Sequence, residues 1–244
     1  RDYRRQQPQI VLRGGAEMKA MIAIPCYDSK VHMVTSKCLW QEQAIAAQHG
    51  VDLKVVYQPG ISLVHSARNL LCWEFFKDEH KPDKLIFIDA DTGWLPGTVT
   101  MLAKSPRDVV AAAVRKRREP EEYAMKWLDT EVEQEADGCI EIAGIGMALT
   151  AISRNCLETF RDKTPELAYA AHLPDGVGDV TLHGYFSSPI SDGTLWGEDI
   201  FFCEQWRKLG GKVHVDPRFP TIHAEGPKQY HGLLGKWMNA QVPS

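Results

Sequence analysis

Short apolar runs alternate along the chain with longer stretches in which apolar residues recur every three to four positions. The short runs predict buried strands at 19–25, 52–57, 85–88 and 108–114. The longer stretches predict helices at 34–49, 62–80 and 198–209, with a further helix after Pro96. Strands with apolar interiors that alternate with helices are typical of a parallel sheet covered on both faces. The pattern therefore predicts an α/β fold in one domain, with a central, mostly parallel sheet flanked by helices.

The pattern changes in the second half of the chain. Residues 144–150 predict a strand that another backbone approaches closely, because two glycines weaken an ordinary strand. Residues 163–195 are rich in Gly, Pro, Asp and Ser. A connection of that length without regular structure is typical of a functional or mobile segment. A last strand is predicted at 212–216.

Composition narrows the class of protein. The chain has 244 residues, of which 44% are hydrophobic and 25% charged, values close to those of globular proteins. The net charge of −4 gives no global positive field for nucleic acid or anionic lipid. No apolar run reaches the ~18 residues of a membrane helix. The six cysteines form no C-x-x-C pair or zinc-ligand spacing, so we expect reduced core cysteines. These features predict a cytoplasmic protein.

Domain boundaries follow from where the regular apolar segments begin. The first of them starts at Met18, so residues 1–17 are interpreted as an N-terminal arm or an added remnant. Residues 18–226 are predicted to form the folded domain, and 227–244 a C-terminal tail.

Two aspartates follow the apolar run at 85–88. Asp89 and Asp91 stand at the carboxyl end of the predicted strand, where open α/β sheets bind their ligands. Carboxylate oxygens at this edge suit magnesium or manganese that bridges phosphate groups. Two solvated loop aspartates would show the same pattern, so the D-x-D motif does not decide between these interpretations.

Other motifs occur in a fixed order around this pair. They are I-A-I-P-C-Y-D at 22–28, A-R-N at 67–69, D-A-D at 89–91, G-I-G at 144–146 and W-G-E-D at 196–199. Their order and spacing resemble glycosyltransferases of the GT-A fold, especially the family-2-like group and short phage and bacterial members. The resemblance extends from Met21 to about Gly226, and it implies the cytoplasm of a bacterial cell or of an infected host cell as the location. It implies a Rossmann-like GT-A domain that transfers a hexose or pentose from a nucleotide-sugar donor to an acceptor hydroxyl.

The resemblance also implies roles for single residues. The nucleotide sugar would be bound by Asp28, Arg68, Asn69, Asp89 and Asp91. Asp91, with His223, would hold manganese or magnesium. Asp199 would accept the proton of the acceptor hydroxyl, with Glu198 as the substitute base. A single displacement would invert the anomeric centre, although some families with a D-A-D motif retain its configuration. Helix-start carboxylates and a packed histidine are the alternative interpretations of Glu198, Asp199 and His223.

The acceptor side is less well defined. Gly144, Gly146, Trp196, Arg115 and Arg117 are assigned to it. The basic tetrad, residues 115–118, leaves the same sheet edge as the D-x-D motif, and it is either a solvated surface or a contact for diphosphate or an anionic acceptor. A modified DNA base is one candidate acceptor, but a net negative charge is unusual in DNA-binding domains. Glycan, protein and lipid acceptors stand beside it.

Two other functions share these motifs. The D-A-D-T sequence at 89–92 also resembles haloacid-dehalogenase-like phosphohydrolases, in which the first carboxylate attacks phosphorus. That family has its motif on the first strand, whereas at least two strands precede it here, and 197–203 lacks the second acid of the later motif. A module of GT-A shape that binds a nucleotide sugar without turnover is the third interpretation.

Overall fold

A seven-stranded sheet forms the centre of the protein. The computed structural model describes residues 18–173, 177–191 and 193–241, so the arm expected at 1–17 lies outside the described residues. The strands are ordered β2-β1-β3-β9-β5-β14-β7. Their bounds are β1 (Met18–Pro25), β2 (Val51–Gln58), β3 (Lys84–Ile88), β5 (Val109–Ala112), β7 (Ile140–Ile142), β9 (Leu149–Ser153) and β14 (Val213–Asp216). Of these strands, β9 and β7 run antiparallel to their neighbours, and the other five share one direction. The predicted α/β fold with a central, mostly parallel sheet is confirmed.

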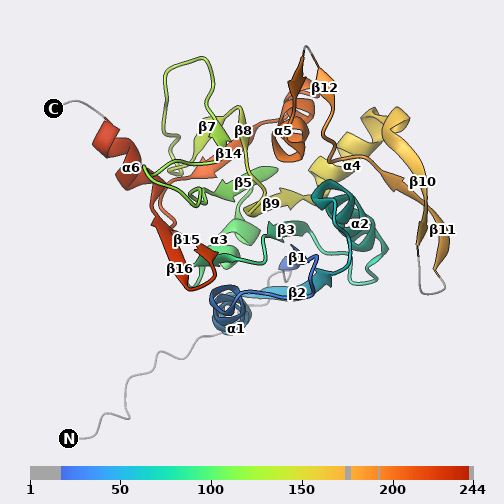
Figure 1. The fold of residues 1–244 in the computed structure, drawn as a ribbon, viewed down its shortest axis with the longest axis horizontal. Helices are drawn as coiled ribbons and strands as arrows, with labels where there is room; N and C mark the ends of the chain where they lie inside the picture. The colour runs from blue at the N-terminus through green and yellow to red at the C-terminus, as the bar shows by residue number, and fades with distance from the viewer. Residues whose placement is uncertain (1–17, 174–176, 192, 242–244) are drawn as a thin grey trace, which may run out of the picture.

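Helices cover both faces of this sheet. In Figure 1, α1 (Met33–Gln48) and α3 (Thr98–Lys104) lie on one side of the row of strands. On the other side lie α2 (Val64–Lys77), α4 (Arg154–Lys163) and α5 (Glu198–Lys208). The predicted helices at 34–49, 62–80 and 198–209 therefore form within three residues of their expected bounds.

Side chains of the central strands alternate between two cores. Ile86 and Ile88 of β3 pack in the core that contains α1 and α3, whereas Phe87 packs in the core that contains α2, α4 and α5. All three residues are fully buried. This two-sided burial is the physical reason for the unbroken apolar sequence of the strand.

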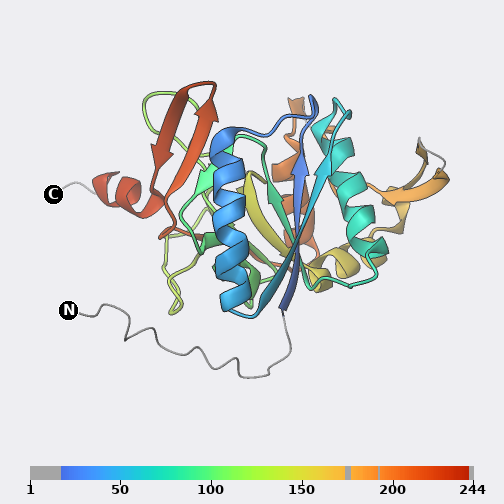
Figure 2. The ribbon, with the colours of Figure 1, turned by 90° about the horizontal axis from the view of Figure 1, so that it is seen from below.

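A second, smaller sheet joins the end of the chain to the segment after β3. It has the order β16-β15-β4, with β4 (Thr92–Trp94), β15 (Thr221–Glu225) and β16 (Lys228–Gly232). Helix α6 (Leu234–Gln241) follows, and Trp237 packs against the core and donates a hydrogen bond from Nε1 to the carbonyl of Glu121. The sequence predicts a tail at 227–244. Its described residues form a strand and a helix instead, and the red hairpin and helix lie against the body in Figure 2.

Residues 163–195 contain more regular structure than expected. After a short 3₁₀ turn at Pro165–Leu167, β10 (Ala168–Leu173) pairs with β11 (Gly178–His183), and this hairpin projects from the body in Figure 1. A smaller hairpin pairs β12 (Ile190–Ser191) with β13 (Thr194–Leu195). The strand predicted at 144–150 is divided, because β8 (Gly144–Ile145) pairs with β6 (Met125–Lys126) and β9 begins only at residue 149. Among the described residues, no helix is long and apolar enough to cross a bilayer.

Candidate active site

Two adjoining clefts open at the carboxyl ends of the central strands. The first has a volume of about 550 Å³ and lies between the loops that follow β1 and β3 and the start of α2. The second has a volume of about 240 Å³ and lies between α2, the 145–148 segment and the start of α5. Val64 and Asp89 line both clefts. We call them the first and the second cleft.

The pairing of β4 with β15 brings Asp91 and His223 together. His223 lies opposite Thr92 in this pairing, which places its ring beside the residue before Thr92. The Nδ1–H of His223 donates to the carbonyl oxygen of Arg115 at 2.8 Å, so Nε2 faces the Asp91 Oδ1 at 3.5 Å. The other carboxylate oxygen of Asp91 lies 3.2 Å from Nη1 of Arg117. Asp91 and His223, which are far apart in the sequence, thus form one polar pair.

The two members of this pair shift each other's pKa. Burial raises the pKa of Asp91, but the hydrogen bond and charge of His223 and the charge of Arg117 outweigh burial and hold it below its ordinary value. Burial lowers the pKa of His223, but its contacts with Asp91 and the carbonyl of Arg115 outweigh burial and raise it above its ordinary value. Each partner favours the charged form of the other.

These residues fit a divalent metal. A histidine that ligates a metal usually donates its other ring N–H to a carbonyl or carboxylate, which fixes the ring and its tautomer. His223 has this arrangement through the carbonyl of Arg115, with Nε2 beside a carboxylate. A carboxylate with an imidazole suits manganese, whose preferences include oxygen donors. Asp91 and His223 would hold the ion.

A second acidic and histidine group lies elsewhere. Within the described ranges, Glu135, Glu141 and His214 bring three potential ligand atoms within 4.8 Å of one another. The guanidinium of Arg107 donates to Glu135 at 2.5 Å and lies 2.7 Å from Nε2 of His214. A cation therefore already neutralises this group.

Arg68 on α2 joins the two ends of the site. Its side chain is only 4% exposed, with Nη2 donating to Oδ1 of Asp89 at 3.0 Å and Nη1 donating to Oε1 of Glu198. One buried guanidinium thus fixes the end of β3 to the start of α5. Asp89 and Glu198 share the single positive charge of Arg68.

Asn69 faces away from both clefts. Its Nδ2 donates to the carbonyl of Phe186 at 3.0 Å, and its Oδ1 accepts from the N–H of Phe186 at 2.9 Å. The amide is buried and saturated by this backbone contact. Asn69 therefore holds the segment after β11 against α2, and it does not line the cleft in which the sequence assigns it to the nucleotide.

Asp199 is placed differently from its neighbour Glu198. It lines the second cleft and accepts a hydrogen bond from the N–H of Ile200, and it forms no ion pair with the residues that the structure describes. Burial raises the pKa of Asp199, and the negative charge of Glu198 raises it further. A carboxylate with a raised pKa and no counter-ion is suited to accept a proton.

The residues assigned to the acceptor side separate into two groups. Gly146 lines the second cleft, and a Cβ atom there would stand 3.4 Å from Oδ2 of Asp199. Gly144 instead packs against α5, where a Cβ atom would stand 3.1 Å from Cδ1 of Ile200. Trp196 precedes α5, with Nζ of Lys126 5.6 Å from its ring centroid, outside the lining of both clefts.

Asp28 and Tyr27 also line the first cleft. Asp28 lines it and is exposed, with Oδ2 3.2 Å from Nζ of Lys30. Beside it, the ring of Tyr27 is 63% exposed and also lines the cleft. The sequence places Tyr27 in the loop after the first strand, and an aromatic residue next to a candidate nucleotide ligand was the signal that could have singled it out.

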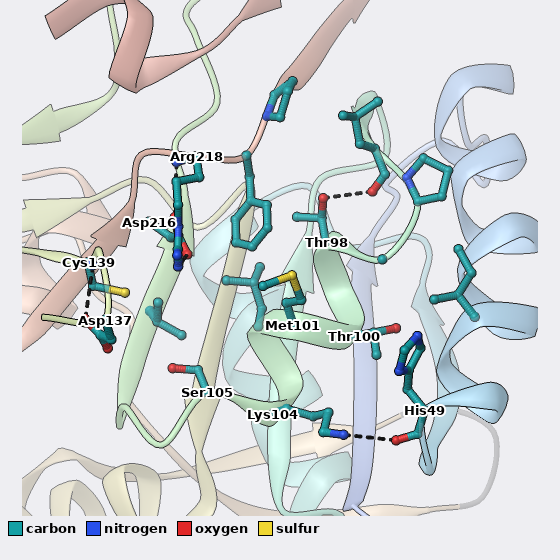
Figure 3. A pocket seen from close by; sticks show the side chains of 18 of the residues that line it. His49, Thr98, Thr100, Met101, Lys104, Ser105, Asp137, Cys139, Asp216 and Arg218 are labelled. Carbon is teal, nitrogen blue, oxygen red and sulfur yellow. Dashed lines mark hydrogen bonds and ion pairs between the residues drawn. The ribbon is translucent and has the colours of Figure 1, made fainter. Parts of the chain in front are cut away.

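A further cavity lies away from these residues. It has a volume of about 720 Å³ and lies between α1, α3 and the loop after β14, as Figure 3 shows. Met101 contributes to its apolar wall, and several of its polar groups are already paired. Lys104 donates to the carbonyl of His49, and Arg218 forms a two-pronged pair with Asp216. Size alone therefore does not locate the chemistry, which needs the carboxylates of the smaller clefts.

Comparisons with protein-family models and with curated proteins give no match. Solved structures of similar fold include A197 from STIV, with a TM-score of 0.49 and 15% identity over 85% of this chain and 86% of that chain. The catalytic domain of Drosophila β1,4-galactosyltransferase 7, in complex with xylobiose, has a TM-score of 0.47 and 12% identity over 82% and 65%. A glycosyltransferase involved in the glycosylation of the major capsid of PBCV-1 has a TM-score of 0.33 and 11% identity over 60% and 68%. These likenesses concern the fold, and any chemical role of single residues is argued from the geometry of the two clefts.

Proposed function

We propose that this protein is a metal-dependent glycosyltransferase that moves a hexose or pentose from a nucleotide-sugar donor to an acceptor hydroxyl. The observation that carries the proposal is the junction of the two clefts at Asp89. Asp91 lines the first cleft and lies beside His223, which lines the second cleft together with Asp199. Asp199 forms no ion pair with the residues that the structure describes. The order of motifs that resembles GT-A enzymes supports the same function.

The first cleft is suited to the donor. Its volume of about 550 Å³ lies in the ordinary range for small-molecule sites. The exposed ring of Tyr27 offers a stacking surface for the base, and Asp28 offers a hydrogen-bond acceptor beside it. Asp91 and His223 would hold the metal, which would supply charge that stabilises the departing diphosphate. Arg68 keeps Asp89 in place, and Asn69 supports α2 from behind.

The second cleft is suited to the acceptor. Asp199 takes the proton of the acceptor hydroxyl while that oxygen forms a bond to the anomeric carbon. The bond between this carbon and the diphosphate oxygen breaks, and its electron pair leaves with the nucleoside diphosphate. Attack from the opposite face of the sugar inverts the anomeric centre. Glu198 is bound to Arg68, so the unpaired Asp199 is the base.

The lowered pKa of Asp91 favours transfer over the phosphohydrolase alternative. In that alternative Asp91 would donate a proton as a general acid. Burial favours its protonated form, but His223 and Arg117 outweigh burial and lower the pKa. Asp91 is thus ionised at neutral pH, which suits a metal ligand better than an acid.

A panel of nucleotide sugars tests the proposal. Each donor is added with and without manganese, and thermal unfolding is followed together with release of nucleoside diphosphate in the presence of glycan, protein, lipid and DNA acceptors in turn. Ligand binding raises the unfolding temperature. The proposal predicts that at least one donor stabilises the protein only with manganese and releases its diphosphate. Stabilisation without product for every acceptor class would favour a binding module, and no stabilisation by any donor would contradict the proposal.

A further inference from the structure

The basic tetrad, Arg115 to Arg118, is mostly occupied by contacts within its own loop. Lys116 and Arg118 both form ion pairs with Glu122. Arg115 is buried and donates from Nη2 to the carbonyl of Arg118 at 2.7 Å. Backbone bonds close the loop as well, from the N–H of Lys116 to the carbonyl of Glu122 at 2.7 Å. Three of the four basic side chains therefore pair within this segment, and Arg115 and Lys116 also line the second cleft.

Arg117 is the exception in the tetrad. Its side chain is 41% exposed, lines the first cleft, and places Nη1 3.2 Å from Oδ2 of Asp91. The other oxygen of Asp91 faces His223. A guanidinium thus occupies the side of Asp91 that faces the cleft, next to the position at which a divalent metal would be held.

We infer that Arg117 is a diphosphate-binding residue that exchanges partners, neutralising Asp91 in the empty cleft and binding the phosphates of the donor when metal and donor enter. The inference rests on the proposed function. It adds a second cation for the leaving group, supplied by the protein itself, and assigns it to one residue of the tetrad.

Charge drives the exchange. Arg117 lies 3.2 Å from Asp91, so a divalent ion held by the same carboxylate would repel its guanidinium and favour its release from that contact. A diphosphate brings negative charge into the cleft that Arg117 lines, and the planar fork of arginine pairs well with phosphate oxygens. The backbone around Arg117 is held by the loop contacts, including the N–H of Arg118 to the carbonyl of Lys116 at 2.9 Å. The exchange therefore needs only rotation of a half-exposed side chain.

The inference predicts two effects of opposite sign for Arg117→Gln. Without nucleotide, loss of the competing cation raises the affinity of Asp91 for manganese. The gain is about two- to fivefold, the size expected for a solvent-exposed ion pair. Loss of the phosphate contact lowers the affinity for diphosphate in the presence of manganese by about tenfold or more. A residue that only supports the loop would not raise one affinity and lower the other.

Arg118→Gln is the matched control, because Arg118 is the next residue and is paired with Glu122. Manganese alone is titrated into wild type and both variants, followed by electron paramagnetic resonance of the free ion. Inorganic pyrophosphate is then titrated by calorimetry with and without manganese, and circular dichroism checks each fold. The expected result is tighter manganese and weaker pyrophosphate binding for Arg117→Gln, with wild-type values for Arg118→Gln.

Two results would overturn the inference while leaving the proposed function intact. One is an Arg117→Gln variant that binds both probes as wild type does. The other is a parallel loss of both affinities in Arg117→Gln, which would assign Arg117 to the metal site itself. If wild type binds neither manganese nor pyrophosphate, the proposed function fails and the inference fails with it.

Discussion

Adjacent carboxylates acquire different chemistry from their surroundings. Glu198 and Asp199 follow each other at the start of α5, and the sequence alone offers either as the base. Arg68 compensates the charge of Glu198, whereas burial and the charge of Glu198 raise the pKa of Asp199. This difference depends on a contact between residues 130 positions apart, so local sequence does not contain it.

Replacement of the base should separate chemistry from binding. Asp199→Asn keeps the shape of the side chain and removes the proton acceptor, so we expect transfer to fall by about 10²–10⁴-fold. Donor binding in the first cleft should persist, since Asp199 lines only the second. Steady-state turnover and nucleoside diphosphate affinity measure the two effects. Near-normal turnover would move the base to Glu198 or indicate a retaining mechanism.

The same variant should stabilise the folded protein at neutral pH. Because the folded state raises the pKa of Asp199, the stability that protonation of Asp199 contributes is present below pH ~4 and is lost as pH rises through the folded pKa. Asparagine removes the cost of the buried charge above that pKa. We expect a higher unfolding temperature for Asp199→Asn at pH 7–8, by roughly 2–4 °C for each kcal/mol removed. The difference from wild type should shrink at acidic pH. An unchanged or lower unfolding temperature at pH 8 would show that Asp199 is stabilised as an anion.

Elements differ in how far sequence predicts them. The central strands and α1, α2 and α5 have clear apolar patterns because their residues are buried on defined faces. The β4, β15 and β16 sheet has no comparable signal, since β4 has only three residues and most of the residues of β16 are exposed. In this sheet β15 pairs with β4 through contacts between residues more than 100 positions apart. The position of His223 beside Asp91 could therefore be predicted from the resemblance to GT-A enzymes but not from any local sequence pattern.

Gly93 tests whether this small sheet positions the metal ligands. A Cβ atom at Gly93 would stand 2.7 Å from Cγ2 of Val34 and 3.3 Å from Cβ of Ile222. Gly93→Ala should therefore push β4 from β15, destabilise the fold by about 1–3 kcal/mol and weaken manganese binding at Asp91 and His223. Chemical denaturation and manganese titration measure these effects.

A second substitution at Val34 serves as the control for this experiment. Val34→Ala removes the methyl groups that Gly93→Ala would meet, so the double variant should recover part of both losses. If Gly93→Ala loses stability but binds manganese as tightly as wild type, the β4 and β15 pairing does not position the metal ligands.

At the scale of the whole molecule, charge bears on the acceptor. The chain has a net charge of −4, and three residues of the basic tetrad are occupied within their own loop. A DNA-binding surface needs several free cations along one face. We therefore expect duplex DNA to bind weakly, with little change in affinity between low and moderate salt. If the logarithm of the binding constant falls with the logarithm of the salt concentration with a slope of about −3 or steeper, three or more phosphates are contacted. That result would make a modified DNA base the leading candidate acceptor.

We expect Asp91 to couple donor binding to a divalent metal. Calorimetry of nucleoside diphosphates, with and without manganese, on wild type and Asp91→Asn tests it most directly, with Asp52→Asn on the exposed surface of β2 as the matched control. We expect manganese to strengthen diphosphate binding for wild type and Asp52→Asn and to have little effect on Asp91→Asn. Equal diphosphate affinity for wild type and Asp91→Asn, both with and without manganese, would contradict this expectation.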